Sequence, residues 1–88
     1  MKHHELKTDK EPFNASWWGW KQYEIRKNDR DFRVGDQLSL RETVYSGEEM
    51  RNGKPLKYTG RCLGREIMEV RTNYGLKDGW CILGVNVV

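Results

Sequence analysis

The alternation of apolar and polar residues predicts a chain of short strands with one early helix. We expect strands at residues 4–8, 22–26, 37–44, 66–72 and 80–87, the first four from the period-two alternation typical of half-buried strands. The last stretch is apolar on both faces, as expected for a strand that closes a barrel. Turns are expected at residues 73–75 and 77–79. The order predicts an α+β, mainly β fold: a small closed or nearly closed barrel of five to six strands.

The helical pattern lies between the first two predicted strands. Asp9 or Glu11 can cap its start, and Pro12 suits a first helical turn because its missing N–H is not needed there. An apolar face follows at spacing i, i+3, i+4, i+7 through Phe13, Ser16, Trp17 and Trp20. Gly19 is placed to end the helix in a left-handed conformation. Trp18 lies off this face, and we expect it to be partly buried at the helix edge rather than to stack on a base.

The two periodicities together select one core. We expect it to contain Leu6, Phe13, Trp17, Tyr23, Ile25, Leu38, Leu40, Ile67, Ile82 and Leu83. Phe32 and Val34 are expected to anchor the polar loop that precedes the turn at Gly35 and Asp36. Full burial of Trp17 would make Trp17→Ala cost about 3–5 kcal/mol.

The 88 residues predict a single domain over residues 1–88, because the chain is near the lower size limit for independent folding. Only 36% of the residues are hydrophobic, so the aromatic residues must supply much of the buried area. Residues 45–60 are polar and contain the hairpin-type pair Asn52-Gly53. We expect them to form an exposed loop or a flexible hairpin.

A net charge of +3 makes the chain mildly basic, which favours a polyanionic partner. Cys62 and Cys81 lack metal-type spacing and no signal peptide precedes them, so we expect free, partly buried thiols and a cytoplasmic location. No apolar run approaches the ~20 residues that span a bilayer, and we expect no membrane association. We expect no metal and no cofactor, because neither metal-type clusters nor a glycine loop for phosphates is present.

The segment Gly19-x-Lys21-x-x-Glu24-x-Arg26 concentrates chemically active groups. If the neighbouring Tyr23 and Ile25 face the core, Glu24 and Arg26 share the opposite face, and Gly19 lets Lys21 join them. The structural alternative is a set of surface salt bridges that fixes the helix to the strand and contributes about 0–1 kcal/mol.

This G-x-K-x-x-E-x-R pattern resembles the signature of the ASCH (activating signal cointegrator homology) domains, a branch of the PUA-like β-barrel superfamily. Residues 4–8, 24–32, 34–36 and 58–61 resemble a small bacterial and phage branch of that group. The resemblance covers about residues 4–85. It implies a PUA-like barrel that binds RNA or modified nucleotides.

The charged groups of the motif fit this kind of ligand. Arg26 can bind a phosphate through two donors and Lys21 as a point charge, while Glu24 can accept from an exocyclic amine or a ribose hydroxyl. We expect these three to line one cleft, with Lys27, Asn28 and Arg30 as its loop wall. His4 is a further candidate for the site, although a packing role is the alternative. We therefore expect an RNA- or nucleotide-binding module that holds an unpaired or modified nucleotide.

The alternative function is hydrolysis. Some ASCH proteins similar to this chain remove the acetyl group from acetylcytidine, with the motif lysine acting beside a threonine at the position of Glu24 and a glutamate from a later helix. Lys21 matches that pattern, whereas Glu24 departs from it and the later helix is not expected. Others are described as ribonucleases, and Lys21 with Glu24 would then act as acid and base. RNA or a nucleotide is the expected partner of a monomer, and a protein partner is left open.

Overall fold

The computed structural model describes residues 1–73 and 75–87. Within these residues the elements follow one another as β1 (His3–Thr8), α1 (Lys10–Trp17), β2 (Tyr23–Lys27), β3 (Gln37–Thr43), α2 (Gly47–Arg51), β4 (Tyr58–Arg71) and β5 (Trp80–Val87). The expected α+β, mainly β fold is confirmed. The predicted turn at residues 77–79 is also present, because the Trp80 N–H donates to the Lys77 carbonyl. The turn predicted at residues 73–75 includes Tyr74, which lies outside the described residues.

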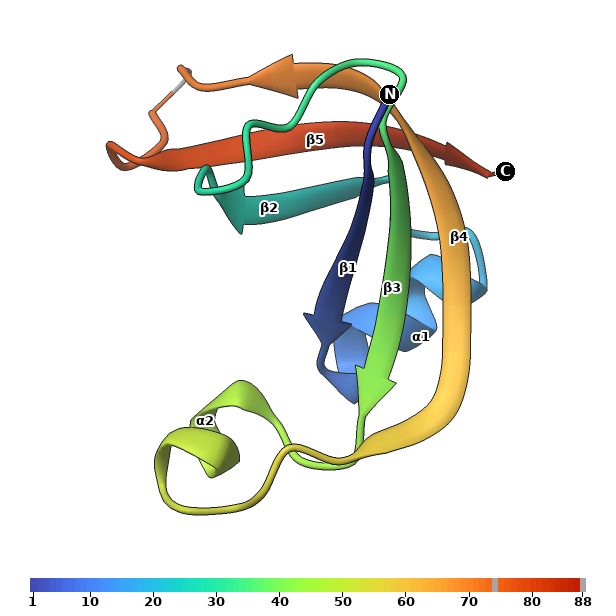
Figure 1. Ribbon diagram of the computed structural model, residues 1–88, viewed down its shortest axis with the longest axis vertical. Coiled ribbons are helices and arrows are strands. Elements are labelled where there is room, and N and C mark those ends of the chain that lie inside the picture. Colours follow the sequence, from blue (N-terminus) through green and yellow to red (C-terminus); the bar gives the residue numbers. More distant parts are fainter. Residues whose placement is uncertain (74, 88) are drawn as a thin grey trace.

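The strands form one sheet in the order β1-β3-β4-β5-β2. β1 runs parallel to β3, and the other pairs are antiparallel. The first part of the long strand β4 pairs with β3 and its second part pairs with β5, with a register shift between Ile67 and Glu69. A bulge of this kind bends a strand and increases its twist. The sheet therefore curls into a half-barrel, with β1 and β2 as its edge strands (Figure 1).

Residues 45–60 contain a short helix and the start of β4 instead of the expected loop or hairpin. The Ser46 side chain accepts from the Glu49 N–H, and the Glu49 side chain accepts from the Ser46 N–H, so α2 begins with a capping box. Asn52 is the C-cap of α2, and Gly53 follows with a φ of 109°, so this pair ends a helix. Asp9 accepts from the Gly47 N–H at 3.0 Å, which ties α2 to the start of α1.

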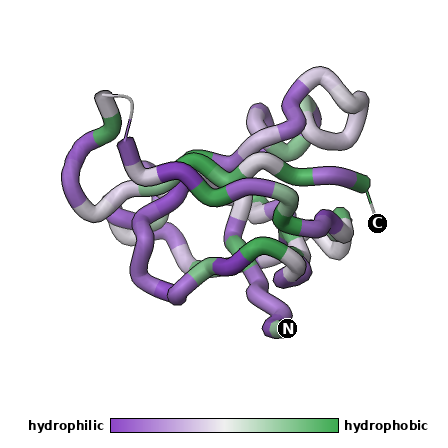
Figure 2. The backbone as a smooth tube through the Cα atoms, turned by 90° about the horizontal axis from the view of Figure 1, so that it is seen from above, coloured by the Kyte–Doolittle hydropathy of each residue, from purple (hydrophilic) through white to green (hydrophobic). Residues whose placement is uncertain are grey.

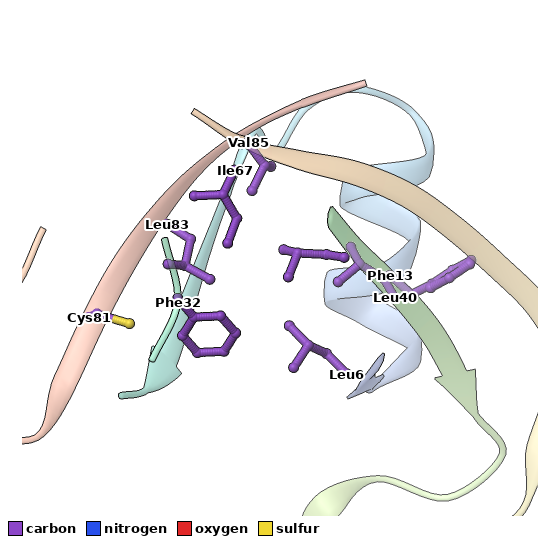
Figure 3. Close-up of a cluster of buried hydrophobic side chains, with 9 residues drawn as sticks. Leu6, Phe13, Phe32, Leu40, Ile67, Cys81, Leu83 and Val85 are labelled. Carbon is purple, nitrogen blue, oxygen red and sulfur yellow. The ribbon is translucent and has the colours of Figure 1, made fainter. Parts of the chain in front are cut away.

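The core lies inside the half-barrel, against α1 (Figure 3). It consists of Leu6, Phe13, Phe32, Leu38, Leu40, Ile67, Cys81, Leu83 and Val85. Six of these residues were selected by the periodicity, and Phe32, Cys81 and Val85 join them. The strand that leads to the C-terminus is mostly hydrophobic along its length (Figure 2), and it supplies three of the nine core residues.

Four residues predicted for the core lie outside it: Trp17, Tyr23 and Ile25 are half-exposed, and Ile82 is partly buried. Trp17 lies in the last turn of α1, beneath the Arg61 guanidinium, which is 4.7 Å from the centre of its ring. Trp20 follows Gly19, whose φ of 80° ends the helical course, so the helical spacing no longer applies to it. Trp18 is exposed rather than partly buried, and its ring stacks on that of Trp20.

No helix among the described residues is long and apolar enough to cross a membrane.

Candidate functional site

The polar face of β2 points into the half-barrel, which is the reverse of the expected orientation. β2 pairs with β5 so that Glu24 lies opposite Leu83 and Arg26 opposite Cys81. Residues directly opposite in an antiparallel pair share a face, and Leu83 and Cys81 are fully buried. Glu24 and Arg26 therefore face inward. The alternation along β2 was correctly predicted, but the side that faces the interior was not.

Lys21, Glu24 and Arg26 form a buried triad. The Glu24 side chain is only 2% exposed, and its two oxygens are held by different cations. Lys21 Nζ donates to Oε2 at 2.7 Å, and Arg26 donates to Oε1 from Nε at 3.2 Å and from Nη2 at 2.9 Å. Burying a carboxylate is costly unless it is paired and hydrogen-bonded, and here both conditions are met. The triad is thus a fixed arrangement with a net charge of +1.

Arginine side chains bridge the two edge strands of the half-barrel. Arg26 Nη1 donates to the Lys7 carbonyl at 2.9 Å, and Nη2 donates to the Thr8 hydroxyl at 3.2 Å. Arg30 donates to the carbonyl of Glu5, which lies two residues before Lys7 on β1. An unpaired strand edge presents free carbonyls, and these guanidinium groups occupy two of them. One side of this junction is β1, and the other is β2 with the loop that follows it as far as Arg30. We call this junction the seam.

A cavity of about 700 Å³, the main cavity, opens beside the triad. Its lining comes from β1 and the start of α1, from β2, from α2 and from Trp80: Lys7, Thr8, Asp9, Pro12, Lys21, Glu24, Ile25, Arg26, Gly47, Met50, Arg51 and Trp80. Its volume lies in the range of small-molecule sites. The three residues of the predicted motif are therefore brought to one concave surface, as the sequence suggested.

The main cavity is cationic. Four cations and two carboxylates line it, which gives a difference of +2. Among the described residues, the Lys7 and Arg51 side chains make no hydrogen bond or ion pair. Trp80 adds an aromatic surface that is one-third exposed. Unpaired cations beside an aromatic ring provide the groups that bind phosphate and stack on a base.

A second cavity of about 270 Å³ adjoins the first. It is lined by Leu6, Ile25, Arg26, Lys27, Asp29, Arg30 and Trp80. Lys27 and Arg30 of the predicted loop wall therefore belong to this second cavity and not to the main one. Asn28 lines neither; its N–H donates to the Gly79 carbonyl at 2.7 Å and holds the loop to the start of β5.

His4 lines neither cavity, so the structure does not bring it together with the other candidate residues. Its Nε2 is 2.9 Å from Asp36 Oδ2, and its ring meets Phe32 edge-on at 4.8 Å. Asp36 also accepts from the Lys2 and Arg33 N–H groups. His4 thus packs the loop before β3 onto β1, which was the alternative role. Phe32 anchors that loop as expected, whereas Val34 is exposed.

The contacts of Asp36 make stability depend on acid pH. The His4 hydrogen bond, followed by those from the Lys2 and Arg33 backbones, lowers the pKa of Asp36 from 3.8 to about 2. A carboxyl whose pKa is lower in the folded state stabilises that state above its unfolded pKa, and the contribution is lost as the pH falls from about 4 to about 2. Denaturation midpoints measured across this window should fall less steeply in Asp36→Asn than in the wild type. Asp78→Asn, on an exposed turn, is the matched control, and equal slopes in all three proteins would contradict this role.

Several lining residues were not predicted from the sequence. Thr8 and Lys7 reach the main cavity because β1 is an edge strand, which is a property of the topology and not of the local pattern. Met50 and Arg51 reach it from α2. The capping box formed by Ser46 and Glu49 was a sequence signal that could have predicted this helix.

The remaining candidate chemical groups lie outside the cavities. Burial, and to a lesser degree the charge of Asp29, raises the pKa of the Cys81 thiol, so this core thiol stays protonated and unreactive. Cys62 is exposed, contrary to the partial burial expected. Among the described residues, no group of three His, Cys, Asp or Glu side chains is placed to hold a metal ion.

Comparison with known proteins identifies one family. The family described as "Domain of unknown function (DUF3850)" matches residues 3–85, nearly the whole chain. A comparison with curated proteins finds no match. The family's description carries no activity or ligand, so it adds no functional residue to those found from the geometry. By the extent of this match, the chain belongs to the DUF3850 family.

Proposed function

We propose that this protein binds RNA or a nucleotide and holds an unpaired or modified nucleotide in the main cavity. The observation that carries the proposal is the pair of unpartnered cations, Lys7 and Arg51, facing a cavity that already holds a net positive charge. A phosphate is the ligand group that would use such donors. The resemblance to the ASCH branch of the PUA-like barrels supports the same ligand class, and we propose that relationship as well.

The triad serves this function by positioning. Glu24 uses both oxygens on Lys21 and Arg26, so its role is to hold these cations rather than to select a ligand donor. Lys21 uses one of its three donors on Glu24, and the others remain for a ligand. Arg26 directs most of its donors to Glu24, Lys7 and Thr8. Lys21, Lys7 and Arg51 are therefore the proposed phosphate-binding residues, with Trp80 as the stacking surface.

Hydrolysis remains a second candidate because Lys21 Nζ and Glu24 Oε2 are within proton-transfer distance, at 2.7 Å. For Glu24 to act as a base, however, it would have to release a cation while buried. The two functions are separated by incubating the protein with acetylcytidine and with short RNA. A binding module yields no product, whereas turnover that disappears in Lys21→Ala would establish a hydrolase.

Binding itself is tested with Arg51→Gln. Arg51 is exposed and unpaired, so its replacement should leave the melting curve unchanged and weaken the binding of short single-stranded RNA about tenfold, the loss expected for one charge-assisted contact. Lys57→Gln removes the same charge from an exposed site outside both cavities and is the matched control. Isothermal titration at several salt concentrations measures both. If the two variants bind with the same affinity as the wild type, the main cavity is not the site.

A further inference from the structure

The main and second cavities share three lining residues, Ile25, Arg26 and Trp80, so they adjoin along β2. The Arg26 side chain extends from β2 and donates to the Lys7 carbonyl on β1. The Arg30 side chain donates in the same way to the Glu5 carbonyl. Glu5 and Lys7 are two residues apart on β1, a separation of about 6.6 Å at the usual rise of a strand. The seam therefore presents two guanidinium groups in a row, at a spacing on the order of one step of an extended nucleic-acid strand.

The charge of these two adjoining cavities exceeds what one nucleotide can neutralise. The second cavity has three cations and one carboxylate, a difference of +2. Both cavities together, with Arg26 counted once, have six cations and three carboxylates, a difference of +3, which equals the net charge of the whole chain. The rest of the chain is therefore neutral on balance, and the excess positive charge of the protein is concentrated around the two cavities.

Two features show that the second cavity also has unused binding capacity. The Lys27 side chain makes no hydrogen bond or ion pair among the described residues. Arg30 is partly exposed, its contact with Asp29 is long at 4.0 Å, and one of its donors is used on Glu5. A guanidinium has five donors, so most of those of Arg30 remain for a ligand.

We propose that the ligand is a single-stranded oligonucleotide whose chain runs along the seam through both cavities, rather than a free nucleotide. This inference rests on the proposed function and specifies its ligand class. One base lies in the main cavity against Trp80, with its phosphate near Lys21 and Arg51. The next phosphate lies in the second cavity at Lys27 and Arg30.

The test compares adenosine 5′-monophosphate with the 5′-phosphorylated trinucleotide of adenosine, both titrated into the wild-type protein. The trinucleotide should bind about tenfold more tightly, because one further phosphate, the one placed at Lys27 and Arg30, contributes about tenfold. The slope of its log affinity against log salt should be steeper by about 0.7, the value for one further phosphate bound by the protein. Equal affinities and equal slopes for the two ligands would overturn the inference and leave the proposed function intact.

Lys27→Gln tests whether the additional affinity of the trinucleotide comes from the second cavity. Lys27 is exposed and unpaired, so this variant should fold normally, which circular dichroism checks. It should weaken the trinucleotide about tenfold and the mononucleotide less than threefold. Lys57→Gln is again the control for the loss of one charge. An equal loss for both ligands would overturn the inference, and a failure of both to bind the wild type would overturn the proposed function with it.

Discussion

Replacing Glu24 with glutamine should destabilise the fold by about 3 kcal/mol. Glutamine preserves the shape of the side chain but removes the charge that holds Lys21 and Arg26, whose side chains are 17% and 24% exposed. Two largely desolvated cations would then face each other without a counter-charge. Removing one partner of a fully buried pair costs about 3–5 kcal/mol, and we take the lower end because both cations retain some water.

Glu5→Gln is the matched control for this effect. Glu5 also pairs with an arginine, Arg41, at 3.5 Å, but its side chain is largely exposed. An exposed pair of this kind contributes about 0–1 kcal/mol. Free energies of unfolding from denaturant titrations should therefore differ clearly between the two variants. If Glu24→Gln were as stable as Glu5→Gln, the triad would not be the buried structural unit described here.

Phe13→Ala should cost about 3–5 kcal/mol, whereas Trp17→Ala should cost about 1 kcal/mol. Phe13 is fully buried at the centre of the contact between α1 and the sheet. Trp17 is 47% exposed, and its ring lies between that of the buried Phe13 and the Arg61 guanidinium at the surface. The cost of about 3–5 kcal/mol expected for a fully buried Trp17 therefore does not apply.

Thermal unfolding of the two variants measures this difference. A domain of this size has little stability to lose, so Phe13→Ala should be largely unfolded at room temperature while Trp17→Ala retains a cooperative transition. The opposite ranking would mean that α1 packs on the sheet through its tryptophan face.

The sequence predicted the elements of this fold better than the orientation of their faces. β1, β2, β3 and β5 were placed within one or two residues, because the first three have the alternation of a half-buried strand and β5 is a short apolar run between turns. The first half of β4 was missed: residues 59–62 are all exposed, so no apolar pattern marks them, and pairing with β3 makes them a strand. The prediction of which face of β2 points inward was wrong for a related reason. Hydropathy favours Tyr23 and Ile25 for the interior, whereas pairing with Leu83 and Cys81 places Glu24 and Arg26 there.

The candidate site was predictable in part. The motif correctly grouped Lys21, Glu24 and Arg26, since only three other residues separate them along the chain. The groups that complete the cavity, among them Lys7, Arg51 and Trp80, come from distant parts of the chain. Their convergence depends on the curl of the sheet and on the position of α2 relative to α1, which no local pattern encodes.

The central claim, that the main cavity is the ligand site, is tested most directly by nuclear magnetic resonance during titration with the adenosine trinucleotide. The four tryptophan indole N–H groups are reporters at known places, because Trp80 lines both cavities while Trp17, Trp18 and Trp20 lie around the end of α1. The account predicts that the largest shifts occur at the Trp80 indole and at the backbone amides of Lys21, Arg26 and Arg51. Shifts confined to the stacked pair Trp18 and Trp20, with an unchanged Trp80 signal, would contradict it.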